Sequence, residues 1–209
     1  MKVLLFNGSP HEKGCTYTAL REVAGALEKE GVDAEIAHIG NALFHTCTGC
    51  GYCGKQTPGR CVFEDDPVNA MLAKAAHADA YVLGSPVHFA SASGAITTFL
   101  DRFFYAGGQT HAYKPGAVVL SCRRGGATAT WDQLNKYFGI RNMPIVSSQY
   151  WNMVHGNTPE EVRQDLEGMQ TMRTLGRNMA WLLQCLKAGE EAGVARPVPE
   201  THAQTNFIR

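Results

Sequence analysis

The fold is decided by two stretches of similar design, VLLFNGSPHEKGCT at residues 3–16 and YVLGSPVHFAS at residues 81–91. In each stretch a short apolar run ends in Gly-Ser-Pro, and a helix-like pattern follows. Open α/β sheets bind ligands at the carboxyl ends of their strands, where loop and helix N–H groups converge. The two stretches therefore predict two strand-to-helix loops that share one binding site.

Strand and helix patterns alternate outward from these loops. Apolar residues at helical spacing mark Leu20 to Leu27, with a stop at Gly31, and Ile96 to Phe103, with a stop at Gly107-Gly108. Further strands are predicted at 34–39, 117–121 and 144–148, and further helices at 67–76 and 128–138. Alternation of this kind predicts a parallel sheet with right-handed crossovers and helices on both faces.

The C-terminal helix carries its own start signal. Thr158-Pro159-Glu160-Glu161 combines an N-cap threonine, a proline at the first helical position and a glutamate three residues after the cap. It predicts one helix from 158 to about 187, ended by Gly189, so that residues 1–188 form a single domain and 189–209 a tail. The helix has more apolar residues than one sheet face needs, which predicts a homodimer or tetramer; the alternative is that it only completes the cover of the sheet.

Composition limits the possible partners. The 209 residues are 44% hydrophobic, enough for one core, and 19 basic residues balance 19 acidic ones. A neutral chain whose one basic cluster is Arg123-Arg124 argues against nucleic acid and anionic membranes as partners. The chain runs from Met1 directly into a strand pattern, so we expect a cytoplasmic protein in which the seven cysteines are ligands or free thiols.

Three motifs together resemble a known family. Residues 7–16, residues 84–91 and the segment from Gly94 through Leu100-Asp101-Arg102 look like the flavodoxin-like NAD(P)H-dependent FMN reductases, over roughly residues 1–150. Within that family the chain is most similar to the iron-sulfur flavoprotein type, which carries a cysteine loop after the second strand. The resemblance implies a five-stranded parallel sheet of order 2-1-3-4-5, FMN as cofactor, NAD(P)H as electron donor, and a small acceptor such as a quinone, a nitroaromatic or free flavin.

The first loop suits the FMN phosphate. Hydroxyl groups and the N–H groups of residues 11–16 lie at the positive end of a helix, where an anion is favoured. By resemblance, His11 stands where the family commonly has Arg and Cys15 where it has Asn, and Lys13 supplies a positive charge. The predicted phosphate-site residues are Ser9, His11, Lys13, Cys15, Thr16 and Thr18.

Two later loops suit the flavin ring. In the second loop Pro86 fixes the backbone, and by resemblance the positions that line the ring are Pro86, Val87, His88, Phe89 and Ser91. The third loop, after the strand at 117–121, contributes Cys122, Arg123, Gly125 and Gly126. Its N–H groups are expected at the pyrimidine edge, and the Arg123 guanidinium would stabilise the anionic reduced flavin. No catalytic side chain is assigned, because flavin N5 carries the chemistry.

An irregular stretch at about 45–66 holds a cysteine motif. Cys47, Cys50, Cys53 and Cys61 follow the spacing C-x2-C-x2-C-x7-C, which gives the four thiolates that a [4Fe-4S] cluster needs. Tetrahedral zinc and free or redox-active thiols are the alternatives. Cys15, Cys122 and Cys185 are expected to be buried small residues.

Three functions follow from these patterns. The first is an NAD(P)H-dependent FMN oxidoreductase, the second an iron-sulfur flavoprotein in electron transfer, and the third a flavin or thiol redox sensor. Outside these motifs, we expect Asp66 to cap the helix at 67–76 and Asp101-Arg102 to make structural contacts.

Overall fold

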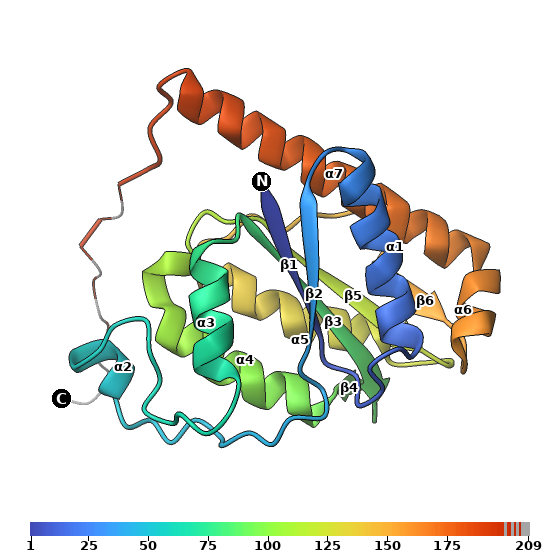
Figure 1. The fold of residues 1–209 in the computed structure, drawn as a ribbon, viewed down its shortest axis with the longest axis horizontal. Helices are drawn as coiled ribbons and strands as arrows, with labels where there is room; N and C mark the ends of the chain where they lie inside the picture. The colour runs from blue at the N-terminus through green and yellow to red at the C-terminus, as the bar shows by residue number, and fades with distance from the viewer. Residues whose placement is uncertain (199, 202, 204, 206–209) are drawn as a thin grey trace.

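A twisted sheet lies between two layers of helices (Figure 1). The computed structural model describes residues 1–198, 200, 201, 203 and 205. The parallel strands follow the predicted order, and the order is β2 (Asp33–His38), β1 (Lys2–Asn7), β3 (Ala80–His88), β5 (Gly116–Cys122) and β6 (Met153–His155). The fourth and fifth parallel strands are numbered β5 and β6 because a short hairpin strand comes before them in the chain. The sixth strand, β4 (Ser91–Ala92), pairs antiparallel with the end of β3. The flavodoxin-like α/β fold is thus confirmed.

Both faces of the sheet are covered. Helices α1 (Cys15–Lys29) and α7 (Leu166–Glu191) pack on one face, and α3 (Val68–Ala76), α4 (Gly94–Gly107) and α5 (Ala127–Gly139) on the other (Figure 1). In β1, Leu4 and Phe6 face the α3, α4 and α5 layer, whereas Val3 and Leu5 face the α1 and α7 layer. All four are fully buried, as expected for a central parallel strand.

Three short helices complete the described chain, namely α2 (Tyr52–Lys55), the 3-10 helix η1 (Gly108–His111) and α6 (Pro159–Gln164). The helix signals predicted at Leu20 to Gly31 and at Ile96 to Gly107 are confirmed. The apolar stripe from Leu20 to Leu27 is buried, and α1 ends in a Schellman motif in which Val32 N donates to Leu27 O at 3.0 Å. Gly31 closes this turn with φ of 74°. No helix within the described residues has the length and apolarity needed to cross a membrane.

The fifth parallel strand is not where the sequence pattern placed it. Residues 144–148 make one isolated bridge, between Ile145 and Gly116, and the strand itself is β6. The reason is local: the Ser148 hydroxyl lies 2.7 Å from both Tyr150 O and Asn152 Oδ1, to one of which it donates, and it accepts from Tyr150 N at 3.3 Å, which turns the chain away from β5. The chain returns when Asn152 O accepts from Leu120 N at 3.0 Å.

The predicted continuous helix from 158 to 187 is wrong, because the chain forms two helices that are separated at Asp165. The Thr158 hydroxyl caps α6 as expected, accepting from Glu161 N at 3.3 Å. The Asp165 carboxylate then caps α7, accepting from Gly168 N at 2.9 Å and from His155 N at 2.7 Å. Helix α7 also passes the predicted stop and ends at Glu191.

The second Gly-Ser-Pro is not a loop, since β3 continues through it to His88. Alternate residues of β3 face β1, and the Gly84 carbonyl on that side accepts from Gly8 N at 2.8 Å. Strand β1 ends at Asn7, opposite Gly84, so Pro86 faces the same side beyond the end of its neighbour. A proline there removes no ladder hydrogen bond, because none is available.

Candidate functional site

The first two predicted loops meet directly at the carboxyl edge of the sheet. Besides the Gly8 to Gly84 bond, the Ser93 hydroxyl donates to Gly8 O at 2.8 Å, and Ser93 N donates to Ser85 Oγ at 3.0 Å. Ser93 also caps α4, accepting from Ile96 N. The start of α4 is therefore fixed to both β1 and β3.

The third loop joins the same edge through two contacts. The Thr16 and Ser121 hydroxyls lie 2.8 Å apart, which links α1 to the end of β5. Gly126 has φ of 95°, and a Cβ placed on it would lie 2.6 Å from Ala90 Cα. Only glycine fits this position without a shift of the backbone. We call the three segments 8–14, 86–92 and 122–126 together the rim.

The start of α1 is open at the rim. Its N-cap is Gly14, and among the described residues no side chain caps the helix. The N–H groups of Cys15, Thr16 and Tyr17 belong to the first turn, which has no intrahelical acceptors. Uncapped N–H groups at the positive end of a helix form a site suited to a phosphate or another anion.

The predicted phosphate-site residues gather around this helix start in two groups. Ser9, Thr16 and Thr18 are buried, whereas His11 and Lys13 are exposed. The Ser9 hydroxyl accepts from His11 N at 3.2 Å, and the Thr18 hydroxyl donates to Gly14 O at 3.1 Å. The Thr18 hydroxyl proton is therefore used within its own helix and is not directed at a ligand.

Cys15 lies at the side of this group. It is half-buried, and its Sγ lies 3.8 Å from Gly156 O. Burial is the main cause that raises the pKa of the Cys15 thiol. A thiol with a raised pKa is a packing group rather than a nucleophile at neutral pH.

The second segment of the rim is a strained hairpin. Its turn residues Phe89 and Ala90 have φ of 51° and 57°, values that glycine or asparagine normally supplies. The Gln133 side chain holds the hairpin, since its Oε1 accepts from Ser91 Oγ at 2.8 Å and from Ala92 N at 3.0 Å. The Phe89 ring is fully exposed, and His88 is exposed beside it, while Pro86 and Val87 are half-buried. Strain that is maintained in this way is typical of ligand sites.

The third segment adds an exposed arginine pair, Arg123-Arg124, to the rim. Arg123 is exposed, as is Gly125, and Cys122 is buried. Burial raises the pKa of the Cys122 thiol. Cys185, in contrast, is exposed on α7, so its prediction as a buried residue is wrong. Its position just before the predicted helix end gave no sign of which side it faces.

The four cysteines of the loop line one cavity. Cys47 and Cys50 are exposed, and Cys53 and Cys61 are half-buried, around a space of about 20 Å³ that holds roughly one water molecule. Burial raises the pKa of the Cys53 thiol, and the neighbouring cysteines add to the effect. Within the described residues no three His, Cys, Asp or Glu side chains converge closely enough to hold a metal ion.

Comparison with known proteins identifies the family. The sequence profile described as NADPH-dependent FMN reductase matches residues 1–158. The chain belongs to this FMN reductase family. An iron-sulfur flavoprotein of Methanocaldococcus jannaschii is 31% identical over 90% of this chain and 100% of the relative. One from Methanosarcina thermophila is 25% identical over 91% of this chain and 100% of the relative.

Solved structures share the fold of this FMN reductase family member. RosB, solved with bound 8-demethyl-8-formylriboflavin-5'-phosphate, superposes with a TM-score of 0.70 at 14% identity, over 100% of this chain and 94% of RosB. The NAD(P)H:quinone oxidoreductase from Methanothermobacter marburgensis gives a TM-score of 0.62 at 15% identity, over 86% of this chain and 96% of that one. At these identities the likeness concerns the fold.

A buried arginine next to the cysteines was not recognised as part of a site from the sequence. Arg102 of α4 is 2% exposed, and its Nε donates to Cys61 Sγ at 3.2 Å. Its guanidinium forms an ion pair with Asp66, whose other oxygen accepts from Val68 N at 3.1 Å and so caps α3 as predicted. The available signal was a charged residue within the apolar stripe of the helix, between Phe99 and Phe103.

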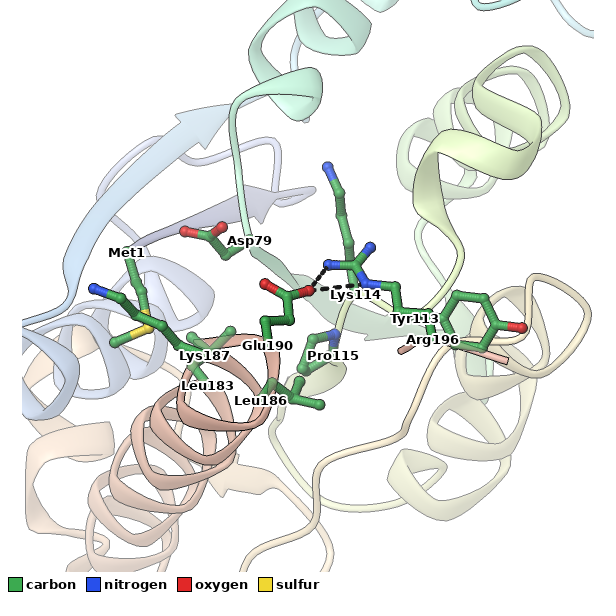
Figure 2. A pocket seen from close by; sticks show the side chains of 10 residues that line it. All are labelled: Met1, Asp79, Tyr113, Lys114, Pro115, Leu183, Leu186, Lys187, Glu190 and Arg196. Atoms are coloured by element: carbon green, nitrogen blue, oxygen red, sulfur yellow. Dashed lines mark hydrogen bonds and ion pairs between the residues drawn. The ribbon is translucent and has the colours of Figure 1, made fainter. Parts of the chain in front are cut away.

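A larger hollow, of about 350 Å³, lies at the opposite edge of the sheet. Figure 2 shows Met1, Asp79 and Pro115 in its wall, and these residues precede β1, β3 and β5. Glu190 and Arg196 form an ion pair with each other across it (Figure 2). Ligands of doubly wound sheets bind at the carboxyl ends of the strands, whereas this hollow lies at the amino ends. It is therefore not the candidate cofactor site of this protein.

Proposed function

We propose that this protein is an FMN-dependent oxidoreductase that passes electrons from NAD(P)H through FMN at the rim to a small acceptor, such as a quinone, a nitroaromatic or a flavin. The observation that carries the proposal is the convergence of the three rim segments on the uncapped start of α1. The family description, NADPH-dependent FMN reductase, supports the choice of cofactor and donor.

The rim residues divide the binding of FMN among themselves. The N–H groups of the first turn of α1, with the Ser9 and Thr16 hydroxyls, would hold the phosphate, and exposed Lys13 and His11 would add positive charge. The hairpin from Pro86 to Ser91 would cover one face or edge of the ring, and Gly125 and Gly126 would offer N–H groups to its pyrimidine edge. Bound FMN supplies the ring that accepts a hydride and releases electrons.

Arg123 would act electrostatically. It is exposed at the rim, where a guanidinium near the pyrimidine edge favours the negative charge that a reduced flavin develops. The chain would thus bind, orient and tune the cofactor, and no side chain is required as a proton donor or acceptor.

We further propose that the cysteine loop binds a [4Fe-4S] cluster. The donor set fits, because four thiols line one cavity and four thiolates are the ligands of a cubane cluster. Two relatives that match over 100% of their length are named iron-sulfur flavoproteins. A cavity of about 20 Å³ means that the segment of Cys47 and Cys50 would have to open outward to admit the cluster.

One experiment tests both cofactors. Protein purified without oxygen is examined by absorbance and analysed for FMN, iron and sulfide, in parallel with Cys50→Ser and the control Cys185→Ser, which removes an exposed thiol far along the sequence from the loop. We expect flavin bands in all three proteins and a broad iron-sulfur band that Cys50→Ser alone lacks. A colourless wild-type protein that does not bind added FMN refutes the flavin proposal.

The metal content decides among the alternatives for the loop. Zinc in place of iron would indicate that the cysteine loop is a structural metal site. A loop with metal-free thiols would indicate an FMN reductase without a cluster. Steady oxidation of NAD(P)H with quinone or nitroaromatic acceptors is expected in every case. If no acceptor supports turnover and thiol oxidation changes the oligomeric state instead, the protein is a redox sensor and the oxidoreductase proposal is wrong.

We also propose a homodimer or tetramer that acts in the cytoplasm. Helix α7 exposes Leu166 and Trp181, which are 77% and 66% exposed, although its other face is packed on the sheet. Contact with a second copy along α7 would bury these two apolar side chains. A monomer by light scattering at micromolar concentration contradicts the assembly.

A further inference from the structure

Arg102 reaches four places on the cysteine loop from one guanidinium. Its Nε donates to Cys61 Sγ at 3.2 Å, Nη1 to His45 O at 3.2 Å and to the Asp66 carboxylate, and Nη2 to Phe63 O at 3.5 Å. The guanidinium carbon also lies 5.1 Å from the centre of the Phe63 ring. The Arg102 and Asp66 side chains are each only 1% exposed, so these contacts are made away from water.

The backbone of Cys61 is fixed as firmly as its sulfur. Cys61 N donates to Asn69 Oδ1 at 2.8 Å, and Asn69 Nδ2 donates to Cys61 O at 3.0 Å and to Phe63 O at 2.9 Å. Asn69 belongs to α3, and Arg102 belongs to α4. Cys61 is therefore attached to two helices of the sheet cover.

The other three cysteines differ. Within the described residues no hydrogen bond reaches the sulfur of Cys47, Cys50 or Cys53, and the first two are exposed. The contrast separates Cys61, whose sulfur and backbone are both hydrogen-bonded to the helices of the sheet cover, from Cys47 and Cys50 on the irregular loop and Cys53 on α2, which is held by packing against the core.

We propose that Arg102 is the positioning residue of the cysteine site, which holds the Cys61 sulfur as its fixed corner and donates an N–H bond to it. The proposal rests on the [4Fe-4S] cluster proposed above for the cysteine loop. Hydrogen bonds to the sulfur ligands are among the factors that set the potential of an iron-sulfur cluster, because they stabilise the extra negative charge of the reduced form. Arg102 would thus make cluster reduction easier and cluster loss slower.

The test variant is the double substitution Arg102→Met with Asp66→Asn. It removes one positive and one negative charge, so the net charge is unchanged and no buried carboxylate is left without a partner. We expect the equilibrium constant for cluster reduction to fall about tenfold, which lowers the midpoint potential by about 59 mV for a one-electron couple. The measurement is an anaerobic redox titration followed by cluster absorbance, with the rate of iron loss to a chelator as a second readout, expected to rise.

Two further variants keep the test decisive. Arg60→Gln is the matched control, because Arg60 precedes Cys61 but lies at the surface, paired with Glu64, and its loss should leave both readouts unchanged. Arg102→Lys replaces the double variant if that variant does not fold. It keeps a cation beside Asp66 but lacks the planar guanidinium, so we expect the midpoint potential to fall in this variant as well.

The outcomes separate the two proposals. Wild-type protein that contains no iron overturns the cluster assignment and this inference with it. Wild-type protein that contains the cluster, with an unchanged potential and unchanged iron loss in the Arg102 variants, overturns this inference alone.

Discussion

Gly126→Ala should push two segments of the rim apart while the sheet stays intact. A methyl group on Gly126 would lie 2.6 Å from Ala90 Cα, 2.9 Å from Ala90 Cβ and 3.0 Å from Val87 Cγ1. Two of these neighbours belong to a hairpin turn whose φ values are already positive. Neither the turn nor the start of α5 can accept the methyl group without a shift of the backbone.

The cost has two parts. Left-handed backbone, φ of 95° at Gly126, costs an alanine about 1–2 kcal/mol. Overpacking against the hairpin adds about 1–3 kcal/mol. If the hairpin stays in place, the sum of about 2–5 kcal/mol is lost from the free energy of unfolding. If the hairpin moves away, FMN loses one wall, and a loss of about 2 kcal/mol in binding corresponds to roughly 30-fold weaker affinity.

Gly139→Ala is the matched control, since Gly139 is exposed at the other end of α5, away from the rim, and a Cβ there meets nothing within 4 Å. The assays are FMN titration by quenching of flavin fluorescence, and urea unfolding of each apoprotein. We expect Gly139→Ala to match the wild type in FMN affinity and to be at least as stable, since alanine is the better helix former. The reasoning is refuted if Gly126→Ala retains wild-type affinity and stability, or if both variants are impaired equally.

Three more predictions use the same fold. Burial lowers the pKa of His111 to about 4 from 6.5, so the unfolded chain takes up the proton first as the pH falls. The His111 contribution to the free energy of unfolding is therefore complete above about pH 6.5 and is lost as the pH falls toward 4, with a loss of about 2–3 kcal/mol at pH 4.5. Urea unfolding at pH 7.5 and 4.5 should show a smaller loss in His111→Gln, and an equal loss contradicts the assignment. Asp165→Ala removes the cap of α7 and should cost about 1–2 kcal/mol in urea unfolding, whereas exposed Glu167→Ala should cost little. Thr16→Val should weaken FMN binding about tenfold, as measured by titration. Thr18→Val should have a smaller effect, because the Thr18 hydroxyl already donates its proton to Gly14 O. The opposite ranking would show that Thr16 is not part of the phosphate site.

Features with a local cause were predictable from the sequence. The apolar stripe of α1 and its glycine stop, the Thr158 cap and the Asp66 cap each depend on residues within a few positions of one another. The position of the rim was predictable for the same reason, since Gly-Ser-Pro directly follows the apolar run of β1.

Features with a distant cause were not predictable. Pro86 remains in a strand only because β1 ends two residues earlier in register, and the sequence around Pro86 contains no sign of that. The last strand moved to β6 because a serine side chain competes with the sheet for the backbone. Arg102 donates hydrogen bonds to His45 and to Cys61, which are 57 and 41 positions away in the sequence. The position of Arg102 within the apolar stripe of α4 marks it as unusual but does not indicate these partners.

Helix α4 connects the two proposed redox sites and also keeps them apart. Ser93 at its start bonds the rim through Gly8 O, and Arg102, nine residues on, bonds Cys61. At 1.5 Å per residue these two anchors are roughly 13 Å apart along the helix axis. Phe99 and Phe103 on this helix are fully buried, so α4 is fixed against the sheet as a rigid element. The separation between a flavin at the rim and a cluster at Cys61 would then be set by the length of a buried helix rather than by loop motion.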